Sequence, residues 1–235
     1  MNDGVVLALA ALEGFYGESQ ILHGVDLAIG RGEIVTLVGR NGAGKTTTLR
    51  AIMGILRRRR GSARVMGAET IAWPPEKIAR LGIGYVPEER GIFASLNVTE
   101  NLLLPPRLKP GGMSLDEIYA LFPNLRERAT SGGSRLSGGE QQMLAIARVL
   151  RTGADFLVLD EPTEGLAPVI VAQIGVALDA IRQRGLTVLL VEQNFRFAAR
   201  VSDRHYVMET GKIVDMIPRS EIEAKMTRLE AYLGV

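Results

Sequence analysis

The sequence lacks cysteine and contains only two histidines, His23 and His205. Disulfides, thiolate nucleophiles and cysteine-ligated metals are therefore excluded, and a histidine-rich metal site is disfavoured. Any metal ion would bind oxygen ligands, the kind that Mg²⁺ prefers. The longest apolar run, residues 5–12, is far short of the roughly 20 residues that a membrane-spanning helix needs. Asp3 precedes this run where a secretory signal would carry Lys or Arg, so we expect a cytosolic chain.

A large excess of charge of one sign is also missing. The 28 Lys and Arg residues stand against 26 Asp and Glu residues, which leaves a formal net charge of +2. A protein that binds nucleic acid usually carries a strongly basic patch, so this balance predicts no nucleic-acid partner. Because 46% of the 235 residues are hydrophobic, the chain supports one globular domain that spans residues 1–235.

Short apolar runs alternate with segments of helical periodicity, which predicts an α/β fold. The apolar runs predict strands buried on both faces of a mostly parallel sheet, at residues 5–10, 34–38, 83–86, 156–159 and 188–191. Helices are predicted at residues 47–56, from 139 to 150, and at 169–184 and 221–233.

The composition changes between residues 91 and 154. Pro- and Gly-rich links there separate short helical segments, which we expect at residues 100–104, with Thr99 as the cap, and at 116–121. This pattern predicts an inserted helical subdomain at about residues 91–154. The remaining segments, residues 1–90 and 155–235, would then form the core of the domain.

A glycine-rich loop follows the strand predicted at residues 34–38 and opens the next helix. It consists of Gly39, Arg40, Asn41, Gly42, Ala43, Gly44, Lys45 and Thr46, with Thr47 as the next residue. This is a phosphate-binding loop in its required strand-to-helix context. Its backbone amides and the helix N-terminus favour an anion, Lys45 adds a full positive charge, and the Thr46 hydroxyl is a candidate Mg²⁺ ligand. The alternative is a glycine-rich turn that binds no phosphate.

Two consecutive carboxylates end the apolar strand at residues 156–159. Asp160 is the candidate for the Mg²⁺ side of a nucleotide site. Glu161 points differently and is the candidate to orient or deprotonate an attacking water, as hydrolysis of a γ-phosphate requires. The alternative is a strand that ends in solvated acids before Pro162.

A second anion-binding pattern precedes the helix that ends at residue 150. It consists of Leu136, Ser137, Gly138, Gly139 and Glu140. One nucleotide's phosphates are already held by the first loop, so a nucleotide bound by a second chain would explain this pattern. The sequence here resembles the ATP-binding-cassette (ABC) ATPases over nearly its whole length. The resemblance implies ATP and Mg²⁺ as cofactors, an antiparallel β part beside the parallel sheet, and a head-to-tail dimer in which residues 136–140 close the partner's site.

Further segments are similar to one branch of that family, the smaller ATP-binding subunit of branched-chain amino acid importers. They are residues 82–88, 97–102, 137–148, 165–168, 191–194 and 231–234. The resemblance implies an ATPase at the cytoplasmic face of the membrane, attached to permease subunits. It also implies a second ATPase subunit as dimer partner, homologous or identical, and an external solute-binding protein that acts indirectly.

Several residues depart from the general cassette pattern or have two interpretations. Glu88 stands where most cassettes place a Gln that contacts Mg²⁺, and Gln193 where most place a His beside the γ-phosphate. Both are usual in the named branch, whereas Glu164 has no explanation at this level. Tyr16 matches the aromatic residue that stacks on adenine, with an ordinary loop tyrosine as the alternative. Residues 57–60, four arginines, are interpreted as a solvated helix end rather than a lipid or nucleic-acid site.

The sequence therefore predicts an ABC ATPase in which Glu161, Gln193 and Lys45 are catalytic. It would drive import of a small polar solute, with branched-chain amino acids as the first choice. Two alternatives stay open: a nucleotide-responsive cassette with weak hydrolysis, and a DNA-associated ABC ATPase. The second would normally carry long coiled coils and a basic stripe, and the sequence has neither.

Overall fold

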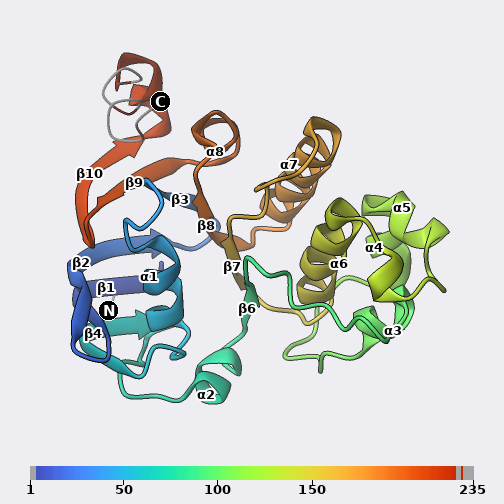
Figure 1. Ribbon diagram of the computed structural model, residues 1–235, viewed down its shortest axis with the longest axis horizontal. Helices are drawn as coiled ribbons and strands as arrows, with labels where there is room; N and C mark the ends of the chain where they lie inside the picture. Colours follow the sequence, from blue (N-terminus) through green and yellow to red (C-terminus); the bar gives the residue numbers. More distant parts are fainter. Residues whose placement is uncertain (1–3, 226–228, 230–235) are drawn as a thin grey trace.

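The structure, a computed structural model, describes residues 4–225 and residue 229. Two β-sheets lie side by side, and a group of helices projects from the far edge of the larger sheet (Figure 1). No helix among residues 4–225 is both long and apolar enough to cross a membrane.

The smaller sheet is antiparallel and has the strand order β2-β1-β4-β5. Its strands are β1 (Val5–Tyr16), β2 (Ser19–Gly30), β4 (Arg58–Val65) and β5 (Ala68–Glu69). Residues 5–10 were expected in the parallel sheet, and that placement is wrong. Only Gly17 and Glu18 separate β1 from β2, and a connection this short joins antiparallel strands only.

The larger sheet has six strands in the order β10-β9-β3-β8-β7-β6. They are β3 (Ile34–Val38), β6 (Ile83–Val86), β7 (Phe156–Asp160), β8 (Thr187–Glu192), β9 (Arg204–Glu209) and β10 (Lys212–Pro218). The four predicted inner strands are confirmed, and every residue of β3, β7 and β8 is buried. Only β10 runs antiparallel to its neighbour. Because β3, β6, β7 and β8 are parallel, the segments that follow them emerge at one edge of the sheet.

Helices α1 (Lys45–Ile52), α2 (Pro75–Ala79), α7 (Pro168–Gln183) and α8 (Phe195–Val201) accompany the two sheets. Helix α1 ends earlier than predicted because Gly54 adopts a left-handed φ of 76° and closes the helix. The interpretation of residues 57–60 as a helix end is therefore wrong. Arg58, Arg59 and Arg60 belong to strand β4, and the guanidinium groups of Arg58 and Arg60 lie over the Phe15 ring.

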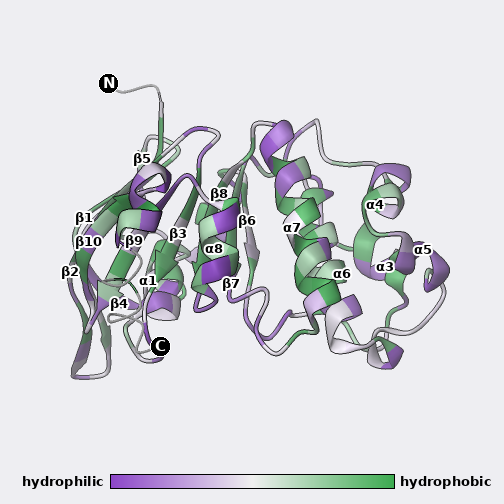
Figure 2. Cartoon of the chain, turned by 90° about the horizontal axis from the view of Figure 1, so that it is seen from above, coloured by the Kyte–Doolittle hydropathy of each residue, from purple (hydrophilic) through white to green (hydrophobic). Residues whose placement is uncertain are grey.

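The inserted segment forms helices α3 (Val98–Leu103), α4 (Leu115–Leu121), α5 (Pro123–Glu127) and α6 (Gly138–Leu150), with a short 3₁₀ turn at Gly133–Arg135. These helices lie together, apart from the antiparallel sheet (Figure 1). The cap of α3 is Asn97 rather than Thr99, because the Asn97 side chain accepts from the Glu100 amide at 2.8 Å. The Thr99 hydroxyl instead donates to the Ala129 carbonyl. Helix α6 lies beside α7, with apolar residues along both helices (Figure 2).

The helix predicted at residues 221–233 is described only in part. Arg219–Glu221 form a 3₁₀ turn, and residues 222–225 are helical. The rest of that prediction and the motif at residues 231–234 lie outside the described residues, apart from Leu229, which is helical and buried.

Candidate active site

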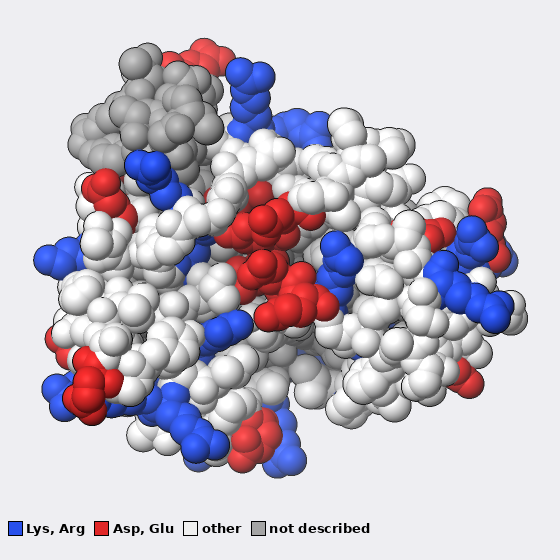
Figure 3. Space-filling view, viewed as in Figure 1, with Lys and Arg blue, Asp and Glu red and all other residues white. Residues whose placement is uncertain are grey.

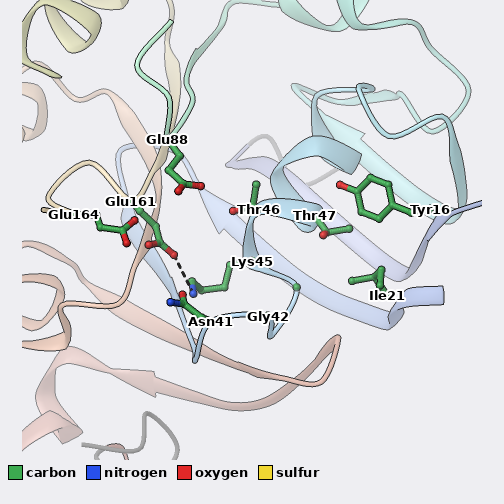
Figure 4. A pocket seen from close by; sticks show the side chains of 11 residues that line it. Tyr16, Ile21, Asn41, Gly42, Lys45, Thr46, Thr47, Glu88, Glu161 and Glu164 are labelled. Carbon is green, nitrogen blue, oxygen red and sulfur yellow. Dashed lines mark ion pairs between the residues drawn. The ribbon is translucent and has the colours of Figure 1, made fainter. Parts of the chain in front are cut away.

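A cavity of about 430 Å³ opens where the phosphate loop meets the loops after β6 and β7 (Figure 4). Its lining includes most of the residues predicted for a nucleotide site, namely Tyr16, Asn41, Gly42, Gly44, Lys45, Thr46, Thr47, Glu88 and Glu161, together with Ile21 and Glu164. Ile21 was not predicted as a site residue, because its place depends on how β2 pairs with β1 and no local motif marks it. Gln193 lies in an adjoining cavity of about 350 Å³, which also reaches Glu161 and Glu164.

The phosphate loop has the conformation that its glycines permit. Gly42 and Gly44 adopt left-handed φ values of 79° and 108°, which residues with a Cβ rarely tolerate. A Cβ on Gly39 would lie 2.4 Å from the Met208 carbonyl oxygen, so no other residue fits there without movement. Helix α1 begins at Lys45, and the first amides of a helix have no partner within it. The loop therefore presents several N–H donors and a helix N-terminus to the cavity.

The Lys45 ammonium is held within the protein by three acceptors. Its Nζ donates to the carbonyl oxygens of Gly39 at 2.9 Å and Arg40 at 3.2 Å. It also forms an ion pair of 3.0 Å with Oε1 of Glu161, drawn as the dashed line in Figure 4. Both side chains are nearly buried, with exposed fractions of 4% and 8%. Lys45 is therefore within reach of both the phosphate loop and the candidate base.

Glu161 has an unusual backbone. Its φ is 45°, in the left-handed region that costs about 1–3 kcal/mol for a residue with a Cβ. Its amide donates to the Val191 carbonyl at 3.0 Å, which helps to hold that conformation. The strained backbone turns the Glu161 side chain toward Lys45 rather than along the course of strand β7.

Asp160 is the last residue of β7, does not line the 430 Å³ cavity and is almost completely buried. Burial raises its pKa to about 6, the neighbouring charges of Glu161 and Glu88 add to this effect, and a hydrogen bond from Thr46 opposes it. The Thr46 hydroxyl donates to Oδ1 of Asp160 at 3.1 Å, and the Tyr85 hydroxyl approaches Oδ2 at 3.5 Å. A buried carboxylate of this kind favours a nearby cation.

The donors at this point fit Mg²⁺ only in combination with phosphate. Among residues 4–225 no group of three or more His, Cys, Asp or Glu side chains is arranged to hold a metal ion. The hydroxyl of Thr46 and the carboxylate of Asp160 are hard oxygen donors that lie side by side. Mg²⁺ commonly binds one or two such groups together with substrate phosphates and water. The residues present therefore fit a magnesium–nucleotide complex rather than an isolated metal ion.

Acidic side chains gather at the centre of one face of the molecule (Figure 3). The cavity itself is lined by three carboxyl groups, from Glu88, Glu161 and Glu164. Glu164 lies beside Glu161, and a hydrogen bond between the two raises the pKa of Glu164. Sequence patterns assigned Glu164 no role, because only the folded loop places it in both cavities.

Tyr16 ends strand β1 at the outer rim of the cavity. Its side chain is 44% exposed, so one surface of the ring is open to a ligand. Arg50, on helix α1, points its guanidinium at the Tyr16 hydroxyl at 3.4 Å. An exposed aromatic ring beside a phosphate loop is suited to stacking on a nucleotide base.

Residues 136–140 form the start of helix α6. The Ser137 hydroxyl accepts from the Glu140 amide at 3.3 Å, and the Glu140 carboxylate accepts from the Ser137 amide at 2.7 Å. Gly139 packs against α7, where an added Cβ would lie 2.8 Å from the Ile170 side chain. None of the residues that line the 430 Å³ cavity comes from this segment. The structure therefore does not bring residues 136–140 together with Lys45 within the described part of the chain.

The parallel sheet, the loop after β3 and the helix that starts at Lys45 define a phosphate-loop nucleotide-binding protein. The ABC transporter family profile matches residues 22–164. The sequence is 40% identical to the high-affinity branched-chain amino acid transport ATP-binding protein BraG of Pseudomonas aeruginosa, over 97% of this chain and 100% of that protein. It is 37% identical to a probable branched-chain amino acid transport ATP-binding protein, LivF, of Archaeoglobus fulgidus, over 88% of this chain and 90% of that one.

Other relatives and solved structures agree on the family. The lipopolysaccharide export system ATP-binding protein LptB of Haemophilus influenzae is 35% identical, over 97% of both chains. A solved ATP-binding subunit of an ABC transporter has a TM-score of 0.81 and 26% identity, over 98% of this chain and 100% of that one. A nucleotide-free ABC transporter cassette has a TM-score of 0.83 over 98% and 99%, and at 22% identity it shows the fold alone.

The chain belongs to the ABC transporter family. It is an ATP-binding cassette of the kind that hydrolyses ATP. The resemblance seen in the sequence, including its branch, and the predicted fold class are both confirmed.

Proposed function

We propose that this chain is the ATPase subunit that powers import of branched-chain amino acids through a membrane permease. The observation that carries the choice of solute is the 40% identity to BraG, which extends over 97% of this chain. An ATPase subunit need not contact the solute, so this choice is supported by similarity and not by the geometry of the site.

In the proposed nucleotide site, the adenine stacks on Tyr16 and the phosphates lie on the loop from Gly39 to Thr47. The amides of the loop and the N-terminus of α1 hold the phosphate oxygens, and Lys45 faces the β- and γ-phosphates. Thr46, Asp160 and, from the loop after β6, Glu88 would hold Mg²⁺ together with the phosphates. When bound, Mg²⁺ would neutralise charge on the phosphates.

Glu161 is the proposed general base that takes a proton from the attacking water. In the present arrangement its carboxylate is paired with Lys45, which holds the proton-accepting oxygen. Phosphates that draw the Lys45 ammonium toward themselves would release Glu161 for the water. Gln193 offers one amide donor to the γ-phosphate, and its Nε2 has no hydrogen-bond partner among the described residues.

Hydrolysis in this proposal needs a second ATPase subunit, identical or homologous. Leu136, Ser137, Gly138, Gly139 and Glu140 would close the partner's nucleotide site in a head-to-tail dimer. The division of the chain follows the same logic: residues 1–90 and 155–235 hold the nucleotide, and about 91–154 carry the segment that acts on the partner. The dimer would lie at the cytoplasmic face of the membrane, on permease subunits that receive solute from an external binding protein.

The similarity to LptB favours a second candidate function, export of lipopolysaccharide. The two candidate functions are distinguished by purifying the chain with the membrane proteins that accompany it and reconstituting them in vesicles. ATP-dependent uptake of labelled leucine, lost in the Lys45→Ala variant, is the expected result. ATP-dependent extraction of lipopolysaccharide without leucine uptake would replace import by export.

A further inference from the structure

Glu192 is a buried carboxyl group to which the proposed mechanism assigns no part. It is the last residue of strand β8, and its side chain is only 2% exposed. Oε1 accepts from the Thr163 amide at 3.2 Å and from the Thr163 hydroxyl at 2.8 Å. Oε2 accepts from the Asn194 amide at 3.3 Å. One side chain therefore joins two separate segments of the chain.

Both segments carry residues of the active site. Thr163 lies two residues after Glu161, in the loop that follows β7, and Asn194 follows Gln193 directly after β8. The same cavity of about 350 Å³ is lined by Glu161, Gln193 and Glu192 itself. The carboxyl group of Glu192 thus fixes the distance between the loop that bears the candidate base and the loop that bears the candidate γ-phosphate donor.

The Glu192 link adds to the contacts of Glu161 with the Val191 carbonyl and with Lys45. Glu161 has the strained φ of 45°, which persists only where neighbouring contacts impose it. The Gln193 side chain has a buried Nε2 without a hydrogen-bond partner among the described residues, so this group does not anchor its loop. Thr163 is buried on one side of the link, and Asn194 caps helix α8 on the other by accepting from the Phe197 amide at 3.1 Å.

Burying the Glu192 carboxyl group in this place disfavours its charged form. Burial raises the pKa of Glu192 to about 7, while the hydrogen bonds from Thr163 and Asn194 favour the charged form. A hydrocarbon side chain would fill the same volume without that cost but could accept no hydrogen bond. The arrangement indicates that Glu192 positions the Thr163 and Asn194 loops through hydrogen bonds rather than merely filling space.

We propose that Glu192 is a positioning residue for ATP hydrolysis, which holds Glu161 and Gln193 in register by fastening the Thr163 loop to the Asn194 loop. The proposal rests on the proposed role of Glu161 as the base. Glu192 contacts neither the phosphate loop that contains Lys45 nor Tyr16. It should therefore affect the rate of hydrolysis and not the affinity for ATP.

The test measures kcat and KM for Mg-ATP with the ATPase dimer assembled on its permease. Glu192→Gln keeps the shape, but one of its two terminal atoms becomes a donor, so one loop loses its acceptor. Thr163→Val removes the hydroxyl donor, and Thr163→Ser restores it. Thr70→Val is the matched control, because Thr70 is also buried and its hydroxyl donates a hydrogen bond, to the Ala63 carbonyl, but it follows strand β5 and lines neither cavity.

We expect Glu192→Gln and Thr163→Val to lower kcat by about tenfold or more, with KM for ATP changed less than about twofold. Thr163→Ser should have most of the wild-type kcat that Thr163→Val loses. The double variant that combines Glu192→Gln with Thr163→Val should be no slower than Glu192→Gln alone. A kcat that falls no further than in Thr70→Val would overturn the proposal. So would a fall in kcat accompanied by an equal rise in KM, or a failure of Thr163→Ser to recover it.

Glu161→Gln is measured beside these variants to distinguish the proposed role of Glu161 as base from the proposed positioning role of Glu192. If Glu161→Gln turns over at the wild-type rate, the proposed base is wrong, whatever Glu192→Gln does. If Glu161→Gln abolishes hydrolysis while Glu192→Gln matches the control, only the positioning role of Glu192 is wrong.

Discussion

Lys45 and Glu161, separated by more than 100 residues in the sequence, form a nearly buried ion pair of 3.0 Å at the floor of the nucleotide cavity. The same ammonium is the group expected to face the β- and γ-phosphates. The same carboxylate is the proposed base. Because Lys45 cannot hold both partners equally well, bound phosphates and Glu161 compete for it. In this account the arrival of ATP both fills the site and frees the base.

The first prediction concerns affinity for ATP. Replacing Lys45 with Ala deletes the charge that faces the phosphates and leaves Glu161 without a partner, which adds an uncompensated negative charge to the site. We expect Lys45→Ala to remove most of the affinity, measured by equilibrium binding of Mg-ATP to the purified chain. Wild-type affinity in that variant would rule out the phosphate-loop assignment.

The second prediction concerns residues 136–140. Ser137 caps helix α6 and does not line the cavity that contains Lys45. Ser137→Arg should therefore leave ATP binding to the isolated chain nearly unchanged while blocking dimer closure and turnover. Ser114→Arg is a suitable control, because Ser114 caps helix α4 with the same kind of capping box but lies outside residues 136–140. Loss of ATP binding by isolated Ser137→Arg would place this segment in its own chain's site.

The third prediction ranks Gln193 below Glu161. A neutral amide can donate one hydrogen bond to the γ-phosphate but cannot carry a charge or relay a proton. Loss of such a bond to a charged acceptor costs about 1.5 kcal/mol, so Gln193→Ala should slow hydrolysis roughly tenfold. Gln193→His should preserve or raise the rate. Single-turnover hydrolysis in the dimer, with the partner's site disabled, is the measurement. A loss as large as that of Glu161→Gln would contradict the ranking.

The fourth prediction concerns acid stability. His205 is fully buried on β9, and neither ring nitrogen has a hydrogen-bond partner among the described residues. Burial lowers its pKa to about 4, with the charge of Arg219 adding to the effect and that of Asp203 opposing it. Between about pH 6.5 and pH 4 the unfolded chain binds a proton that the folded chain does not. His205 alone should therefore lower the free energy of unfolding by on the order of 3 kcal/mol across that interval.

The variant His205→Phe isolates this contribution from that of the carboxylates. Denaturant unfolding of both proteins at pH 7, 6, 5 and 4 should show the wild type losing stability more steeply as the pH falls. The introduced phenyl ring would keep the edge-to-face contact with Phe195, which His205 makes at 5.5 Å between ring centroids. Parallel pH profiles for the two proteins would show that folding does not lower the pKa of His205.

The sequence predicted the parts of the site that depend on neighbouring residues. The phosphate loop, Asp160 and Glu161 each follow a buried strand, and parallel strands bring such segments to one edge without further information. Glu164 and Ile21 were missed as site residues because their places depend on the path of a loop and on strand pairing. The link from Glu192 to Thr163 spans 29 residues and leaves no local pattern.

The errors in the fold have similar causes. The helical periodicity after Lys45 did not indicate that the helix ends before Gly54. The arginines of β4 were therefore assigned to the helix. Their place is set by pairing with β1, where Arg59 lies opposite Gly14 and Arg58 opposite Phe15. The predicted cap of α3, Thr99, lies two residues after the observed cap, Asn97. The Thr99 hydroxyl donates instead to the Ala129 carbonyl, a contact between residues distant in sequence that leaves no local pattern.

The competition of Glu161 and ATP for Lys45 is tested by single-turnover hydrolysis and ATP binding in the assembled dimer, with Glu161→Gln beside the wild type. We expect hydrolysis by Glu161→Gln to fall by about 10² to 10⁴ because the base is gone. We also expect the affinity for ATP to be kept or raised, because the neutral Gln no longer competes for Lys45. Hydrolysis near the wild-type rate would show that another group takes the proton. Weakened ATP binding would show that Lys45 and Glu161 do not compete.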